Sequence, residues 1–163
     1  MILIALGANL PSPAGGPQET LEAALAELEA RGVHIAARSR WYRTAPVPVS
    51  DQPWFVNGVA RVVTALEPLA LLRALQEVEH VFGRLRSVPN AARTLDLDVI
   101  AYDNRLVNTP ELILPHPRMQ DRAFVLLPLA EIAPGWRHPV LGKTVEALIS
   151  ALPAEQKAEP IGA

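Results

Sequence analysis

Two carboxylates lie two residues apart in a short apolar segment of this 163-residue chain. Asp96 and Asp98 alternate with Leu95, Leu97 and Val99, and this period of two places both acids on one face of a strand. Carboxylates held so close repel each other unless a cation lies between them, and paired oxygen ligands suit magnesium shared with substrate phosphates. A strand with a solvated acidic face would show the same spacing, so the spacing alone leaves both interpretations open.

Arginines bracket the acidic pair on both sides. They are Arg84, Arg86 and Arg93 before it and Arg118 and Arg122 after it. Guanidinium groups bind phosphate oxygens in bidentate fashion, and a metal ion neutralises the remaining charge, which is most of what phosphoryl transfer asks of a protein. Surface arginines also keep proteins in solution, but their concentration around one acidic pair favours a polyphosphate site.

Three further residues could contact a substrate. Phe55 and Asn57 lie two apart in a predicted strand, and a ring for stacking beside an amide that donates and accepts hydrogen bonds would fit a flat heterocycle. Phe55 could equally be a core residue and Asn57 the partner of a nearby turn. His116 lies between Pro115 and Pro117 in an extended segment, where we expect a ligand contact.

The spacing of apolar residues predicts the elements that hold these groups. Two helices are predicted, each beginning at a proline and ending at a glycine. They run from Pro17 to Gly32 and from Pro68 to Gly83. Strands are expected over residues 1–6, 33–41, 54–64 and 94–102, and shorter helices over 122–132 and 144–152. The order β-α-β-β-α-β predicts an α+β, ferredoxin-like fold, an antiparallel sheet with both longer helices on one face. Gln76 and Glu79 lie off the apolar stripe of the second helix.

Length and composition restrict the class of protein. A chain of 163 residues, half of them hydrophobic, fits one domain, which we place at residues 1–152 with a frayed tail at 153–163. The net charge of −2 and the lack of a basic run argue against nucleic acid as a partner. Apolar runs are too short to cross a bilayer, and without cysteine any metal needs carboxylates or histidines. We expect a cytoplasmic protein.

Several short segments complete the pattern. The most specific is Arg93-Thr94-Leu95-Asp96-Leu97-Asp98. The others, in chain order, are Leu6-Gly7-Ala8-Asn9-Leu10, Tyr42-Arg43-Thr44-Ala45-Pro46, Asp51-Gln52-Pro53-Trp54-Phe55-Val56-Asn57, Gly83-Arg84-Leu85-Arg86 and Pro115-His116-Pro117-Arg118. Together they cover almost the whole chain and resemble one family, the 6-hydroxymethyl-7,8-dihydropterin pyrophosphokinases of folate biosynthesis.

The resemblance implies a role for each matching position. Asp96 and Asp98 would bind two Mg²⁺ ions that bridge the phosphates of ATP, with Arg84 and Arg93 as further catalytic groups. The pterin pocket would be lined by Thr44, Ala45, Val47, Phe55, Asn57 and Phe124. The ATP side would comprise Gln76, Glu79, Arg84, Arg86, Arg93, His116 and Arg122. The resemblance also implies a monomer.

The chain departs from the family pattern just before the signature arginine. Many members carry an aromatic-Gly-Pro run there, whereas this chain has Asn90-Ala91-Ala92. We expect residues 84–93 to close over ATP and pterin, and to seal the site less tightly than in typical members. Ala45 also stands where a proline is common, and Pro117 where many members place an aromatic residue.

These expectations define one reaction and two alternatives. The hydroxymethyl oxygen of the pterin would attack the β-phosphorus of ATP and release AMP, with alignment and charge neutralisation supplying most of the acceleration. Another magnesium phosphotransferase would act on a different alcohol, and an ordinary kinase would release ADP. A ferredoxin-like ligand-sensing module without catalysis would need neither the acidic pair nor the arginines.

Overall fold

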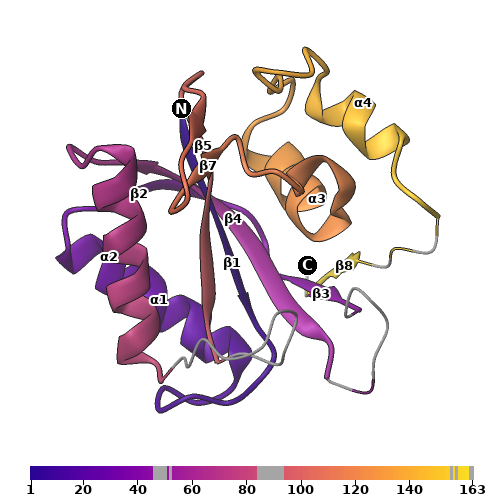
Figure 1. Cartoon of the computed structure of the whole chain (residues 1–163). Helices are drawn as coiled ribbons and strands as arrows, with labels where there is room; N and C mark the ends of the chain where they lie inside the picture. Colours follow the sequence, from indigo (N-terminus) through magenta and orange to yellow (C-terminus); the bar gives the residue numbers. More distant parts are fainter. Residues whose placement is uncertain (46–50, 52, 84–93, 155, 157, 162–163) are drawn as a thin grey trace.

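A computed structural model of the chain describes residues 1–45, 51, 53–83, 94–154, 156 and 158–161. Val47, Arg84, Arg86 and Arg93, which we predict to bind substrates, lie outside this part of the chain, and so does the Asn90-Ala91-Ala92 run. The described residues form a six-stranded main sheet with helices on both faces (Figure 1), and a separate two-stranded sheet.

The sheet is built around three long antiparallel strands. They are β1 (Ile2–Ala8), β4 (Phe55–Val63) and β5 (Asp96–Tyr102), and β1 lies between the other two. The complete order is β5-β1-β4-β3-β8, and β2 also pairs with β4. Because β1 has β4 and β5 as its neighbours, the strand order is that of a βαββαβ, ferredoxin-like sheet, and the predicted fold class is confirmed.

The strand predicted over residues 33–41 is divided. Its parts are β2 (His34–Arg38) and β3 (Tyr42–Thr44), which both pair with β4. Between them the side chain of Trp41 enters the core and lies against Gly58, where an added Cβ would be only 2.5 Å from Cζ3 of the indole. The break between β2 and β3 therefore results from the space that the Trp41 side chain requires.

Two helices cover one face of the sheet. α1 (Pro17–Ala30) and α2 (Pro68–Val81) both begin at a proline. Gly32 and Gly83 follow their ends with φ angles of 82° and 81°, a conformation in which residues other than glycine are strained. Both helices agree with the sequence prediction, and their apolar stripes pack on the side of the sheet that carries Leu95, Leu97 and Val99.

Two shorter helices were predicted, and in the structure they cover the opposite face. They are α3 (Ala123–Ile132), which follows a 3-10 helix (Met119–Asp121), and α4 (Val145–Ser150). They lie on the other side of the sheet from α1 and α2 (Figure 1), and their apolar residues form a second core with residues of β1, β4 and β5. Glu131 fastens α3 to the sheet, because its carboxylate accepts hydrogen bonds from the hydroxyl of Tyr42 and, at 2.9 Å, from the backbone N–H of Arg40.

The tail expected to be frayed contains a strand. β8 (Ala158–Pro160) pairs with β3. The side chain of Gln156 accepts a hydrogen bond from the N–H of Ala123 at 2.8 Å and donates one to the carbonyl of Asp121 at 2.6 Å. These contacts of the described tail residues are all with partners distant in the sequence.

Two smaller features complete the fold. β6 (Val107–Asn108) and β7 (Ile113–Leu114) form a two-stranded hairpin that leads to His116. Within the part of the chain that the structure describes, no helix combines the length and the hydrophobicity needed to cross a membrane.

Candidate active site

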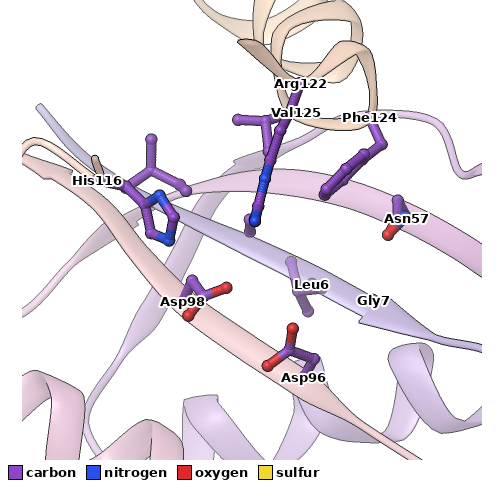
Figure 2. A pocket seen from close by; sticks show the side chains of 11 residues that line it. Leu6, Gly7, Asn57, Asp96, Asp98, His116, Arg122, Phe124 and Val125 are labelled. Atoms are coloured by element: carbon purple, nitrogen blue, oxygen red, sulfur yellow. The ribbon is translucent and has the colours of Figure 1, made fainter. Parts of the chain in front are cut away.

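One pocket lies between the sheet and the start of α3 (Figure 2). We call it the acidic pocket. Its lining comes from β1 (Ala5, Leu6, Gly7), β4 (Asn57), β5 (Asp96, Asp98, Ile100), the segment after β7 (His116) and the start of α3 (Arg122, Phe124, Val125). Segments distant in the sequence thus meet at one place, and each is held by the sheet or by a helix that packs on it.

The two aspartates occupy neighbouring positions on the floor of this pocket. Asp96 lies opposite Gly7, and Asp98 lies opposite Ala5, in the β1–β5 pair. Leu97 between them has its side chain in the core on the other face of the sheet. Both carboxylates point into the pocket (Figure 2), which confirms the facing that the alternation predicts.

His116 faces the aspartates with a defined tautomer. Its backbone N–H donates to the carbonyl of Ile100 at 2.9 Å, and its Nδ1 accepts from the N–H of Arg118 at 3.2 Å. Burial is the main cause that lowers the pKa of His116 to about 4; Arg122 and Arg118 lower it further, and Asp96 opposes them. The ring is therefore neutral at pH 7, and because Nδ1 is an acceptor, Nε2 carries the proton and can donate it to a ligand.

Arg122 and Phe124 form the wall opposite the sheet. Arg122 is the N-cap residue of α3, and its guanidinium carbon lies 5.3 Å from the centroid of the Phe124 ring. Both side chains extend from the helix start towards the sheet, with Asn57 facing Phe124 (Figure 2). A cation on an aromatic face is favourable, so each side chain helps to orient the other.

Asn57 is a buried amide at the other end of the pocket. It is 6% exposed, and its Nδ2 donates to Oγ1 of Thr44, itself 2% exposed, at 3.0 Å. Its Oδ1 lies over Gly7, where an added Cβ would be only 2.6 Å away. Because Gly7 has no side chain, the Asn57 amide can lie directly over its backbone.

A second pocket adjoins the first and shares two residues with it. Asp98 and His116 line both pockets. The second pocket otherwise has largely aliphatic walls with two polar groups, Gln76 and Glu111; the remaining lining residues are Leu72, Val99, Pro110, Leu112, Ile113 and Pro117. Asp98 thus lies at the junction of two spaces that two different ligands, or two parts of one ligand, could fill, and Asp96 lies beside it in the acidic pocket.

Glu79 lies apart from both pockets. It is only 2% exposed, although the helical period places it off the apolar stripe of α2. Its Oε2 accepts a hydrogen bond from the backbone N–H of Leu97 at 2.8 Å. The helical period does not indicate that Glu79 is buried. Its burial depends on the backbone N–H of Leu97 on β5, a strand distant in the sequence, which needs a hydrogen-bond acceptor.

The donor groups of the acidic pocket fit magnesium shared with a ligand. Among the described residues, no three histidine, cysteine, aspartate or glutamate side chains are placed to hold a metal ion by themselves. Two adjacent carboxylates supply hard oxygen ligands, and Mg²⁺ commonly completes such a set with water and phosphate oxygens. The chemistry of Asp96 and Asp98 therefore suits a metal that arrives with a nucleotide.

The predicted site residues fall into distinct groups in the structure. Asn57, Asp96, Asp98, His116, Arg122 and Phe124 line the acidic pocket, and Gln76 lines the adjoining one. Thr44 accepts a hydrogen bond from Asn57 but lines neither pocket. Ala45 and Phe55 are half-buried and also line neither pocket. Sequence reasoning assigned no role to Gly7 or Glu111, and only the motif around Gly7 could have singled it out.

Two carboxylates that can hold Mg²⁺ and an arginine that can neutralise phosphate are groups that a nucleotide-dependent phosphotransferase uses, and here they lie on a ferredoxin-like sheet. Known proteins narrow this class. The family model of 7,8-dihydro-6-hydroxymethylpterin-pyrophosphokinase matches residues 3–134. The chain belongs to this family.

Similar proteins agree with this membership. A Pseudomonas aeruginosa 2-amino-4-hydroxy-6-hydroxymethyldihydropteridine pyrophosphokinase is 43% identical over 155 residues, which cover 94% of this chain and 93% of that protein. The Synechocystis protein of the same name is 41% identical over 148 residues, or 90% and 73% of the two chains. The mitochondrial folate synthesis bifunctional protein of Arabidopsis thaliana is 37% identical over 131 residues, 80% of this chain and 23% of that protein.

Solved structures support the fold. A crystal structure of Plasmodium falciparum HPPK-DHPS superposes with a TM-score of 0.73 at 16% identity and covers 91% of this chain. The present chain spans 43% of that solved chain. At this identity the likeness concerns the fold alone.

Proposed function

We propose that this protein transfers a pyrophosphoryl group from ATP to the hydroxymethyl group of 6-hydroxymethyl-7,8-dihydropterin and releases AMP. Family membership and the names of its relatives support the reaction. The single observation that carries the proposal is that Asp98 and His116 line both pockets. A phosphate chain between two substrates needs such a junction, with metal ligands on one side and a hydrogen-bond donor on the other.

Asp96 and Asp98 would hold Mg²⁺, and we expect two ions. When bound with ATP, the metal supplies positive charge against the phosphate oxygens and keeps them aligned. The carboxylates supply this site only because β5 turns both to the same face.

The residues around Asn57 would bind the pterin. A pterin is flat and carries hydrogen-bond donors and acceptors on its edge, so the ring of Phe124 would contact its face and the amide of Asn57 its edge, both side chains lying at the same end of the acidic pocket (Figure 2). Thr44 fixes the amide by accepting its N–H. Phe55, Ala45 and Val47 would complete the pterin side, as the family resemblance implies.

His116 and Arg122 would act on the phosphates. The neutral ring of His116 can donate from Nε2 to a phosphate oxygen, and the guanidinium of Arg122 can neutralise charge there. The hydroxymethyl oxygen forms a bond to the β-phosphorus while the bond between that phosphorus and the oxygen bridging to the α-phosphorus breaks. The bridging oxygen leaves with AMP, and the hydroxyl proton passes to solvent without an obligatory general base.

The adjoining pocket would hold the nucleoside. Its aliphatic walls suit a planar base, and Gln76 can donate and accept hydrogen bonds at the base edge. Arg84, Arg86 and Arg93 belong to the ATP side by resemblance, and Glu79 is assigned there on the same ground alone. We further expect one catalytic domain over residues 1–152, acting as a cytoplasmic monomer.

One incubation tests substrate and reaction together. The protein is mixed with ATP, Mg²⁺ and 6-hydroxymethyl-7,8-dihydropterin, and the nucleotides are separated. We expect AMP in equal amount to the pterin pyrophosphate, and none without the pterin. Formation of ADP would indicate an ordinary kinase, and binding of both ligands without turnover would indicate a sensing module; either outcome rejects the proposal.

A further inference from the structure

Glu79 is a buried carboxylate to which the proposed reaction gives no defined step. It lies in the last turn of α2 and is 2% exposed. Burying a charged group is costly unless hydrogen bonds satisfy it. The bond that Glu79 accepts from the N–H of Leu97, at 2.8 Å, is therefore a feature with a definite structural purpose.

The position of this bond in the sheet indicates that purpose. β5 is the first strand in the order β5-β1-β4-β3-β8, so within the described sheet it has a strand partner on one side only. Outward-facing N–H groups of such an edge strand need an acceptor from elsewhere. Glu79 supplies one from α2, through a carboxylate oxygen 2.8 Å from the Leu97 nitrogen.

Leu97 is the residue between Asp96 and Asp98. Its side chain is 1% exposed in the core shared with α1 and α2, and its N–H is held by Glu79. Both neighbours therefore project to the opposite face from a residue anchored by its side chain and by its backbone. Because the N–H belongs to the peptide that joins Asp96 to Leu97, fixing it also fixes the direction in which each carboxylate leaves the strand.

The strand needs this second anchor for two reasons. The pairing of β5 with β1 shifts register between Leu3 and Ile4, opposite Ile100, and a strand next to such an irregularity is locally bent and less firmly paired. In addition, two like charges on adjacent outward positions repel before a cation binds. The hydrogen bond to Glu79 opposes both the local bending and the displacement caused by repulsion. It does so at the edge of β5 that is not paired with β1.

We propose that Glu79 is a positioning residue for the carboxylate pair. Its bond to the Leu97 amide sets the spacing at which Asp96 and Asp98 bind a divalent cation together with a nucleotide. This inference rests on the proposed function, because it needs the aspartates to be metal ligands. It assigns Glu79 to the metal site through the backbone, without contact between Glu79 and ATP.

Three variants distinguish the effect of the length of the Glu79 side chain from the effect of its charge. Glu79→Gln keeps the length of the side chain and an oxygen that can accept the bond, but removes the charge. Glu79→Asp keeps the charge and shortens the side chain by one methylene, so the carboxylate no longer reaches Leu97. Glu77→Asp is the matched control, because Glu77 lies on the same helix, is exposed and binds Arg31 at 2.8 Å.

The measurement is binding of Mn²⁺ with α,β-methylene-ATP, followed by the paramagnetism of the ion at a temperature where circular dichroism shows every variant folded. We expect Glu79→Asp to lower the metal–nucleotide affinity by about tenfold or more, the usual effect of losing a group that orients a metal ligand. Glu79→Gln and Glu77→Asp should stay close to the parent protein. Affinity for the pterin alone should be the same in all three, since Asn57 lies on β4.

Two results would overturn the inference. One is a Glu79→Asp variant that binds Mn²⁺ and nucleotide as the parent does. The other is a Glu79→Gln variant impaired as much as Glu79→Asp, which would assign the effect to charge. If Glu79→Asp does not fold, hydrogen exchange at the Leu97 amide of Glu79→Gln decides: protection as in the parent supports the bond, and loss of protection with unchanged metal affinity rejects its role.

Asp98→Asn, titrated in the same way, distinguishes this inference from the proposed function. Undiminished Mn²⁺ affinity in Asp98→Asn would reject the metal assignment, and the inference with it. Weak Mn²⁺ binding in Asp98→Asn together with normal binding in Glu79→Asp would reject the inference alone.

Discussion

A Cβ atom on Gly7 would lie 2.6 Å from Oδ1 of Asn57, its partner across the β1–β4 pair. A real side chain at position 7 would therefore have to displace the Asn57 amide and disturb its bond to Thr44. We expect Gly7→Ala to weaken binding of 6-hydroxymethyl-7,8-dihydropterin by about 1–3 kcal/mol, the usual cost of a buried polar group without its partner. Titration calorimetry with the pterin gives the affinity.

A double-mutant cycle shows whether the effect passes through Asn57. In an Asn57→Ala background there is no amide to displace, so Gly7→Ala should have little further effect on the pterin affinity. An equal loss in both backgrounds would mean that Gly7 acts by another route, such as a shift of β1 itself.

Asn57→Ala alone should also weaken pterin binding by about 1–3 kcal/mol, because a buried heterocycle would lose its hydrogen-bonding partner. Asn108 on β6 is exposed, and Asn108→Ala is the control. Both variants should bind α,β-methylene-ATP as the parent does. A loss of nucleotide affinity with no pterin defect would place Asn57 on the other side of the reaction.

Asp96→Asn and Asp98→Asn should each lower turnover by several orders of magnitude without unfolding the protein. Each change keeps the shape of the side chain but removes a charged oxygen ligand, so a metal that stabilises transition-state charge would be lost. Asp103→Asn is a suitable control, since Asp103 follows the same strand and pairs instead with the N-terminal amine at 2.5 Å. Near-normal turnover in either site variant would contradict the assignment.

The pKa of His116 predicts a pH dependence of stability. Its folded value of about 4 lies below the ordinary 6.5, so the unfolded chain takes up the proton more readily. The contribution of the neutral ring is complete above about pH 6.5 and is lost as the pH falls towards 4. Between pH 7 and pH 5 the parent protein should lose about 2 kcal/mol more stability than His116→Asn, by linkage.

Urea unfolding at the two pH values measures this difference. Asparagine is the chosen replacement because its amide oxygen can accept the bond from the N–H of Arg118 that Nδ1 accepts in the parent. Glu22, Glu29 and Glu131 have lowered pKa values and also destabilise the protein at low pH, but they are common to both proteins. Identical pH dependence in the two would show that His116 is not held neutral.

Local sequence patterns predicted the parts of the site that depend on one element. The alternation around Leu97 was enough to assign both aspartates to one face, since the period of a strand is a local property. The helix limits at Pro68 and Gly83 were equally accessible, because these residues restrict or extend the allowed backbone angles directly.

Other features depend on partners far away in the sequence. Ala158, Glu159 and Pro160 have no strand pattern, and they form β8 only because β3 offers an edge. Glu79 is buried because Leu97 needs an acceptor, which no helical period can indicate. The orientation of the His116 ring likewise comes from the bond to the N–H of Arg118.

The alternation along β5 also limits how this protein can change over generations. A substitution alters one group at a time, whereas loss of Leu97 would send Asp98 towards α2 and turn Val99 into the pocket. The side chains that face the pocket and those that face the core would exchange places in one genetic event. Insertions are therefore tolerated in turns such as the one at Asp103. Inside β5, only an insertion or deletion of an even number of residues keeps each side chain on its own face.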